Sequence, residues 1–278
     1  MNSLPLIFTD LDGSLLDHHD YRWHAAAHDI DTLKNQGIPL IYNTSKTYPE
    51  CFKLQQNMGI NEPFIIENGG AIVFPDNSEL LDLVANQTQP LKDNPAHILQ
   101  LGSEYLQLSA LLNEWIEQFQ FPVIGFHQMT AEEIAQATGL SLEDAKLAAC
   151  RSSSLPFTFN GSNDQFSILE NLAQSHRLKI LKGGRFYHLI GLSDKGSALI
   201  KLASLYNKIS NTTRTTLAFG DSQNDIAMLE ACDYPTAIPS ALGQLLALSN
   251  SNAFYATKSG PAGWSQGFSH QMRAINFL

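Results

Sequence analysis

Two acidic residues directly follow a short apolar run near the start of the chain. Asp10 and Asp12 stand two apart after the residues LIFT, and Gly13 comes next. On its own, such a stretch is as typical of a turn as of a binding site, because Asp and Gly are common turn residues. If the apolar run is a buried strand, both carboxylates lie beyond its carboxyl end, where open parallel sheets bind their ligands.

A second acidic group follows another apolar run late in the chain. Asp221 and Asp225 come after the residues TLAFG. Carboxylates that share one edge of a sheet repel one another unless a cation holds them. Hard oxygen ligands favour Mg²⁺, so the two acidic groups together predict a magnesium site.

Two lysines and a serine complete the pattern expected of a binding site for a phosphoryl group. Lys46 and Lys195 can neutralise charge on phosphate oxygens, and Ser45 offers a hydroxyl. Asp10 is the natural nucleophile, since a carboxylate can form an aspartyl-phosphate. Asp12 lies on the same side of an extended chain, so it can protonate the leaving alkoxide and later deprotonate the attacking water.

The elements that must position these side chains alternate in type. Strand-like apolar runs and helix-like stretches follow one another at both ends of the chain, which predicts a parallel sheet buried on both faces. Gly37 suits the end of the first helix, and Ser193 is the expected N-cap of the helix that carries Lys195. The fold class is therefore α/β, with a doubly wound, Rossmann-like core. The strand-like runs are residues 5–9, 38–45, 63–70 and the run that begins at 215.

The middle of the chain reads differently. Residues 86–97 form a polar, proline-containing stretch with the composition of a linker. Beyond it come amphipathic helices and two strand-like runs around Gly183 and Gly184, which are typical of a hairpin. We expect an inserted α+β domain over residues 86–189. The core is then formed by residues 1–85 and 190–278.

The composition excludes several classes of protein. The chain has 278 residues, 44% of them hydrophobic, and a formal net charge of -10, which argues against binding to nucleic acid. Its three cysteines have neither the number nor the spacing of a disulfide framework or a zinc site. We expect no leader, and no apolar run is long enough to span a membrane. A soluble cytoplasmic enzyme acting on a small molecule is therefore expected.

The motifs resemble, in order, those of the haloacid dehalogenase-like phosphatases. The match consists of DLDGSLLD, the strand-end Ser45, Lys195 within DKGSAL, and GDSQND. Four separated motifs in the right order are far more specific than any one of them. The resemblance implies that Asp10 is the nucleophile, Asp12 the general acid and base, Ser45 a hydrogen-bond donor to the phosphate and Lys195 the charge stabiliser. The implied Mg²⁺ ligands are Asp10, the Asp12 backbone carbonyl and Asp221, with Asp225 or Asn224 nearby.

Longer stretches resemble the mannosyl-3-phosphoglycerate phosphatase subfamily, and the insert resembles its type C2B cap. The match includes PFIIENGGAI, ATGLSLEDAKLAACR, LKGGRFYHLIG and SGPAGW. Leu155 precedes Pro156 where an acidic residue is usual, so contacts between the cap and a hydroxyl-rich substrate are expected to differ. The substrate would be a phosphorylated glycosyl-glycerate, either mannosyl or glucosyl. The predicted substrate-binding residues are Lys46, Asn68, Gly69, Arg151, Lys182, Arg185, His188 and Asn224.

Two other functions remain open at this point. One is a broader sugar-phosphate phosphatase, similar to Cof-like or sucrose-phosphate phosphatases. The other is a catalytically silent module that binds sugar phosphates, although the presence of Asp10, Asp12, Lys195 and Asp221 counts against it. His18 and His19 are interpreted as part of a surface turn, because adjacent residues rarely share a ligand geometry with such acids.

Overall fold

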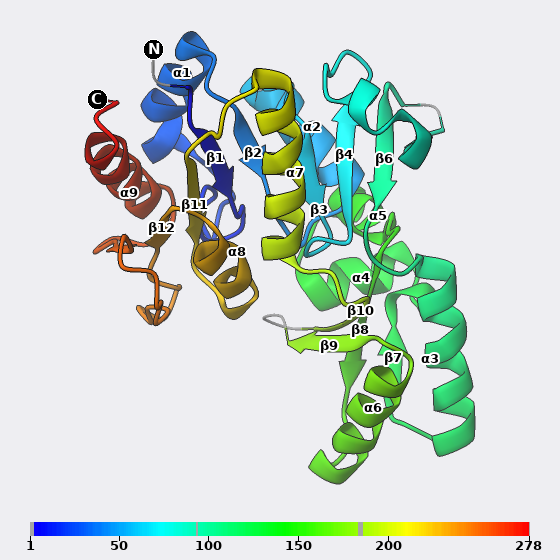
Figure 1. The fold of residues 1–278 in the computed structure, drawn as a ribbon. Helices are drawn as coiled ribbons and strands as arrows, with labels where there is room; N and C mark the ends of the chain where they lie inside the picture. Colours follow the sequence, from blue (N-terminus) through cyan, green and yellow to red (C-terminus); the bar gives the residue numbers. More distant parts are fainter. Residues whose placement is uncertain (1–2, 93, 183–185, 278) are drawn as a thin grey trace.

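A parallel sheet of five strands forms the centre of the computed structural model, which describes residues 3–92, 94–182 and 186–277. The strand order β13-β12-β11-β1-β2 places β1 beside both β11 and β2, although β1 and β11 lie some 200 residues apart (Figure 1). The parallel sheet predicted from the alternating pattern at the two ends of the chain is therefore confirmed, and its first strand lies beside a strand from the C-terminal part. The bounds are β1 (Leu6–Thr9), β2 (Leu40–Tyr42), β11 (Thr216–Gly220), β12 (Tyr234–Ala237) and β13 (Phe254–Tyr255).

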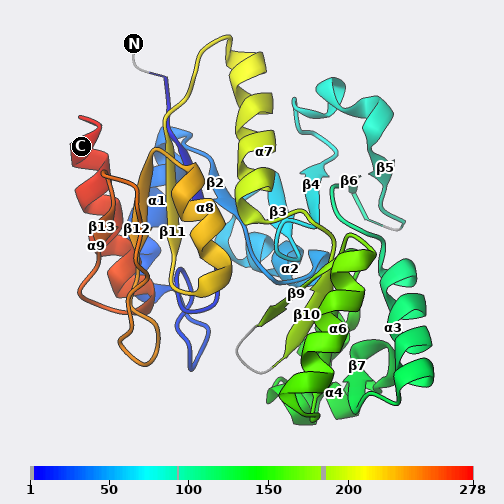
Figure 2. The ribbon, with the colours of Figure 1, turned by 60° about the horizontal axis from the view of Figure 1, so that its bottom comes forward.

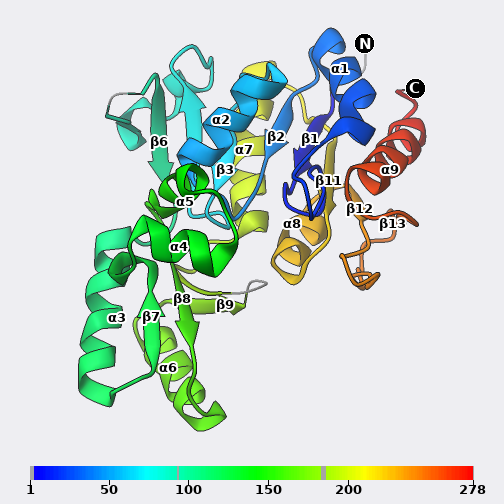
Figure 3. The same ribbon diagram turned by 180° about the vertical axis from the view of Figure 1, so that it is seen from behind.

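Helices cover both faces of this sheet, as the apolar strands predict. Along β1, Ile7 belongs to one buried cluster, whereas Leu6 and Phe8 belong to the other. The first cluster includes residues of α1 (Ala27–Gln36), α2 (Tyr48–Met58) and α9 (Gly260–Ala274) (Figure 3). The second includes residues of α7 (Lys195–Ser210) and α8 (Ile226–Ala231). This is the three-layered α/β core that the sequence indicates.

A second, antiparallel sheet continues the core beyond β2. Its order is β3-β4-β6-β5, and a bridge between Asn43 and Ile65 joins it to the end of β2. The strands are β3 (Phe64–Ile66), β4 (Ala71–Pro75), β5 (Gln89–Pro90) and β6 (Ala96–Gln100). The interpretation of residues 86–97 as a linker is thus wrong in part, because β5 and the start of β6 pair within this sheet. Polar composition misled there, since an edge strand needs no apolar pattern.

A third sheet lies apart from the other two and carries its own helices (Figure 2). Its order is β7-β8-β10-β9, all antiparallel. One of its faces packs on α3 (Tyr105–Phe119) and α6 (Asn163–Ser175) around Trp115. We call this sheet and its helices the cap. Its other elements are β7 (Val123–Gly125), β8 (Ser154–Phe159), β9 (Lys179–Lys182), β10 (Tyr187–Ile190), α4 (Ala131–Thr138) and α5 (Leu142–Ala149).

The division of the chain into a core and an insert stays a prediction, and sheet membership favours a later start for the insert. The two crossings between core and cap lie side by side, since a Cβ on Gly191 would come within 2.8 Å of the Ser103 nitrogen. We propose that the insert runs between these crossings, not from residue 86. The hairpin of β9 and β10 is present, but Gly183, Gly184 and Arg185 lie outside the described residues. No helix in the described part of the chain is long and apolar enough to cross a membrane.

Candidate active site

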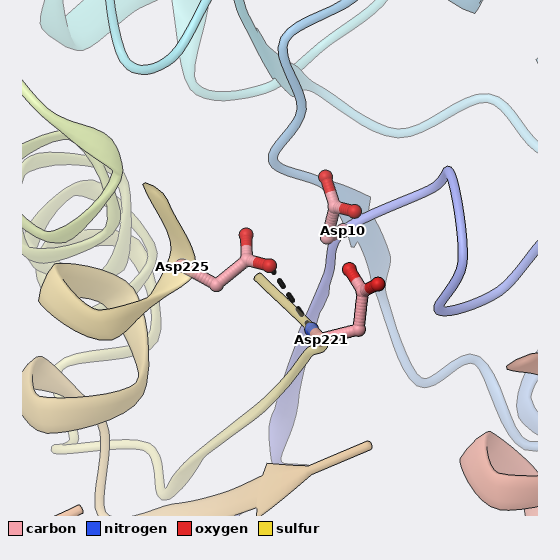
Figure 4. Close-up of side chains that lie close together, drawn as sticks. All are labelled: Asp10, Asp221 and Asp225. Carbon is pink, nitrogen blue, oxygen red and sulfur yellow. Dashed lines mark hydrogen bonds between the residues drawn. The ribbon is translucent and has the colours of Figure 1, made fainter. Parts of the chain in front are cut away.

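Three acidic side chains meet where β1 and β11 end. Asp10 and Asp221 directly follow these paired parallel strands, and Asp225 lies in the short helical turn Gln223–Asp225. One carboxylate oxygen from each lies within 4.8 Å of the others. Figure 4 shows the carboxylates of Asp10 and Asp221 side by side, while that of Asp225 points to the Asp221 backbone. The predicted convergence of the two acidic motifs is present.

A lysine lies against two of these carboxylates. Lys195 is the first residue of α7, and its Nζ lies 2.6 Å from Oδ1 of both Asp10 and Asp225. Its side chain is fully buried, so the ion pairs lie away from water. The N-cap of α7 is Asp194, not Ser193 as we expected: the Asp194 side chain accepts from the Ser197 amide. A carboxylate serves the same capping role as a hydroxyl.

Asp225 is held by donors on both of its oxygens. Oδ1 accepts from Lys195, and Oδ2 accepts from the backbone amides of Asp221 and Ser222. Asp221 differs, because its Oδ1 is buried and has no hydrogen-bond partner within the described part of the chain. An orphaned carboxylate oxygen beside a second carboxylate suits a divalent cation. The residues present therefore fit a metal ion.

The electrostatics of the triad agree with that fit. Burial raises the pKa of Asp10 to about 7, with a further contribution from Asp225. Burial also raises the pKa of Asp221 to about 8, helped by the charge of Asp10. Burial opposes the charge of Lys195, but Asp10 and Asp225 outweigh it and raise the lysine pKa. The acids thus need more positive charge than one lysine provides to ionise fully at neutral pH.

Two members of the triad, Asp10 and Asp221, line a cavity between core and cap. The cavity measures about 640 Å³, and its walls come from strand ends of the core and from β9 and β10 of the cap. Asp10 and Asp221 are at its core side, whereas Lys182 and His188 are at its cap side. Eight of the predicted site residues line it: Asp10, Asp12, Ser45, Asn68, Lys182, His188, Asp221 and Asn224.

Asp12 lies on the cavity wall, paired with a lysine. Lys46 Nζ lies 2.9 Å from Asp12 Oδ2 and 3.6 Å from Glu50 Oε1, and it also sits over the ring of Tyr21. Asp12 Oδ1 is buried and has no hydrogen-bond partner among the residues described. Burial opposes the charge of Lys46, but the two carboxylates raise its pKa above the usual range. Lys46 therefore contacts the proposed acid and base directly.

A smaller chamber of about 160 Å³ adjoins the main cavity. It shares Asp12, Ser45 and His188 with the cavity and adds Lys46 and Arg151. The Arg151 guanidinium donates to the Ser45 carbonyl at 2.9 Å and to Ser154 Oγ at 3.1 Å, so it also ties cap to core. Burial, aided by Arg151, lowers the pKa of His188 to about 3. Its ring is therefore neutral at neutral pH and can exchange hydrogen bonds but not charge.

Two residues singled out in the sequence, Gly69 and Leu155, do not face the cavity. Gly69 does not line the cavity. Its positive φ of 86° and its position against the Asp194 backbone, where a Cβ would clash, show that it lets a turn approach the start of α7. Leu155 is fully buried in the cap core, so the unusual residue before Pro156 does not face the cavity. Arg185, also predicted to bind substrate, lies outside the described residues.

Sequence reasoning missed Glu67, which joins core to cap. Its buried carboxylate accepts from the backbone amides of Ser152 and Ser153 and from the hydroxyls of Ser152 and Ser154, at 2.7 to 3.0 Å. Because one carboxylate accepts from four donors, Glu67 anchors the start of β8 strongly to the core. The stretch ENGG is a visible signal, but its partners lie 85 to 87 residues further along.

We expect Glu67→Gln to lower the free energy of unfolding by at least about 2 kcal/mol. The substitution replaces one carboxylate oxygen, which accepts two hydrogen bonds, with an amide nitrogen that cannot accept either of them. The side-chain volume is unchanged, so no void contributes. Urea denaturation measures the change, with Glu79→Gln as the control because Glu79 is exposed in the loop that follows β4. Equal stability of the two variants would contradict the anchoring role.

His18 was also misinterpreted. Although we placed it on a surface turn, its ring enters the cavity, and Nε2 lies 3.2 Å from Asp221 Oδ2. His19, in contrast, is exposed. A contact of this kind leaves no periodic mark in the sequence.

Comparison with known proteins gives a consistent match. The family model described as haloacid dehalogenase-like hydrolase matches residues 7–260. A glucosyl-3-phosphoglycerate/mannosyl-3-phosphoglycerate phosphatase from Persephonella marina is 36% identical over 94% of each chain. A protein of the same name from Methanococcoides burtonii is 33% identical, also over 94% of each. A crystal structure from Thermoplasma acidophilum, 18% identical, has a TM-score of 0.65 and covers 99% of both chains, which bears on the fold alone.

Proposed function

This chain belongs to the haloacid dehalogenase-like hydrolase family, and on that premise we propose that it hydrolyses the phosphate ester of glucosyl-3-phosphoglycerate or mannosyl-3-phosphoglycerate. The reaction class is supported by the meeting of Asp10, Asp221 and Lys195 in one cavity. The substrate is supported by the two relatives of that name, which match nearly the whole chain. We take the Asp10 to Lys195 pair as the observation that carries the proposal, because it prepares a carboxylate to receive a phosphoryl group.

In the first half of the proposed reaction, a carboxylate oxygen of Asp10 attacks the phosphorus. The bond between phosphorus and the ester oxygen breaks, and an aspartyl-phosphate forms. Asp12 gives its proton to the leaving oxygen, so the product departs as an alcohol. Lys195 holds Asp10 in place, and Ser45 donates a hydrogen bond to the phosphate.

In the second half, water hydrolyses the aspartyl-phosphate. Asp12, now ionised, takes a proton from the attacking water and returns to its starting state. The bond between phosphorus and the Asp10 oxygen breaks, which releases inorganic phosphate and restores the carboxylate. The sum is one ester and one water converted to one alcohol and one phosphate.

We propose Mg²⁺ as the metal. Asp10, Asp221 and the Asp12 backbone carbonyl would hold it, while Asp225, whose oxygens already accept from Lys195 and two amides, would position its neighbours. When bound, Mg²⁺ supplies positive charge that neutralises the phosphate oxygens and keeps Asp10 ionised. Hard carboxylate and carbonyl oxygens favour this ion over softer metals.

The cap side of the cavity supplies the groups proposed to recognise the glycosyl-glycerate. Lys182 lies there as a cation for a carboxylate or phosphate. His188 is neutral and suits a sugar hydroxyl. On the core side, Asn68 Oδ1 accepts from Asn224 Nδ2 at 2.9 Å, and this pair lies on the wall of the cavity. The proposed role of Gly69, Lys46 and Arg151 is indirect: each would position the neighbouring residues that it contacts.

Phosphate release from a panel of esters tests this function. Purified protein with Mg²⁺ should hydrolyse both glycosyl-3-phosphoglycerates faster than sucrose phosphate, hexose phosphates and nucleoside monophosphates. A chelator should stop release, and added Mg²⁺ should restore it. If neither glycosyl-3-phosphoglycerate is hydrolysed while another ester is turned over rapidly, the proposed substrate is refuted. Silence on every ester would refute the reaction.

Asp12→Asn should lower steady-state phosphate release by about 10² to 10⁴-fold, because both halves of the reaction need its proton. An aryl phosphate separates the two halves, since a nitrophenolate leaves without protonation. With that ester we expect a burst of about one equivalent of nitrophenol, followed by slow turnover. Asp20→Asn is the control, because Asp20 is exposed on the same loop. A slow first turnover without a burst would assign Asp12 a different role.

A further inference from the structure

The loop after β1 brings an imidazole to the acidic triad. His18 is only 28% exposed, and it lines the cavity together with Asp10 and Asp221. Its Nε2 is buried and lies 3.2 Å from Asp221 Oδ2, in a close contact that is not a hydrogen bond, and it has no hydrogen-bond partner in the described part of the chain. The ring therefore directs one nitrogen at one oxygen of a proposed metal ligand.

The backbone of the loop is built to hold the ring there. Gly13 has a φ of 83°, and a Cβ on it would clash with both the His18 ring and Asp221 Oδ2. The ring thus lies directly against the Gly13 backbone. Further along, Asp17 accepts from the His19 amide at 2.8 Å and its own amide donates to the Arg22 carbonyl, which closes the turn. The turn directs His18 inward and leaves His19 exposed.

The two oxygens of Asp221 have different surroundings. Oδ2 faces His18, whereas Oδ1 is buried and has no hydrogen-bond partner among the described residues. Lys195 bonds to Asp10 and Asp225, and in the described ranges no lysine, arginine or histidine besides His18 forms an ion pair with the Asp221 carboxylate. Without His18, the carboxylate could rotate about its last bond and exchange its oxygens.

We propose that His18 is a positioning residue for the metal site. The close approach of Nε2 to Asp221 Oδ2 restrains the carboxylate and leaves Oδ1 to face the ion. Groups that contact and orient metal-ligating side chains commonly tune the affinity for the metal. The inference rests on the proposed divalent metal, but it does not depend on the substrate.

Titration of Mg²⁺ and of Mn²⁺ into chelator-treated protein tests the role without substrate. His18→Ala should weaken the binding of both ions by roughly 10- to 100-fold. His18→Gln, which keeps a side-chain N–H donor, should recover part of the loss. His19→Ala should bind as the wild type does. Thermal melts in chelator show whether each variant is folded.

The outcomes separate this inference from the proposed function. If the wild type binds neither ion, the metal part of the proposed function fails. If the wild type binds but His18→Ala binds equally well, only the positioning role fails. If His18→Ala weakens the binding of Zn²⁺ or Ni²⁺ far more than the binding of Mg²⁺, His18 is a direct nitrogen ligand and the positioning role is again wrong. Turnover at saturating Mg²⁺ should return to within a few-fold of the wild type.

Discussion

Asp10→Asn should reduce phosphate release by at least about 10⁴-fold, because an amide cannot form the phosphorylated intermediate. The substitution keeps the size and shape of the side chain, and the amide oxygen can still accept from Lys195. Acid quenching of the wild type during turnover should trap phosphate on the peptide that contains Asp10. The same peptide of the variant should carry none. Persistent turnover by Asp10→Asn would assign the nucleophile to another residue.

The same variant should be more resistant to unfolding than the wild type at pH 8 when a chelator is present. In the metal-free protein the pKa of Asp10 is about 7, well above its ordinary value of 3.8. A carboxyl whose pKa is higher in the folded state ionises first in the unfolded chain. The free energy of unfolding therefore falls as the pH rises from about 4 to 7. Asn does not ionise, so the difference between the proteins should vanish near pH 4. Asp82→Asn, at an exposed acid, is the control.

Lys195→Met should abolish turnover and also destabilise the fold. Lys195 contributes the positive charge that lies 2.6 Å from both Asp10 and Asp225, and its side chain is fully buried. Removing one partner of a buried ion pair leaves uncompensated charge, which costs about 3–5 kcal/mol. Methionine fills a similar volume, so the loss reports charge more than packing. Urea denaturation in chelator measures it, and Lys208→Met on the exposed end of α7 is the control.

A double variant separates the charge effect from other causes. Lys195→Met combined with Asp225→Asn removes one cation and one of its carboxylates. The double variant should regain part of the stability lost by Lys195→Met, since the two residues interact directly. Mg²⁺ should also stabilise Lys195→Met, because any ion that binds only the folded state favours it. Additive losses, with no rescue by either route, would show that Lys195 contributes through packing.

Much of the core was predictable because short-range patterns specify it. Continuous apolar runs identified β1 and β11 as strands buried on both faces, and each turned out to lie between two helical layers. Polar residues that end such strands must gather at one edge of a parallel sheet, so Asp10 and Asp221 were expected to meet. The helix start near residue 194 was placed within one residue.

The errors arose where contacts join distant segments. Residues 86–97 looked like a linker, yet β5 and β6 pair beside β4, because an edge strand carries little apolar pattern. Gly69 was expected to approach a ligand, but it approaches the backbone at the start of α7. Neither partner is adjacent in sequence, so no local pattern could identify it.

The sequence alone determined the strands and helices of the core, the order of the motifs and the chemistry that their acids and lysines can perform. These depend on side-chain type and spacing within a few residues. Only the tertiary structure decided that Lys195 bridges Asp10 and Asp225, that Glu67 holds the cap strand, and that His18 faces Asp221. Each of these contacts joins residues that are far apart in the sequence and that only packing brings together. Sequence periodicity shows which face of an element is buried, but not which residues that face contacts.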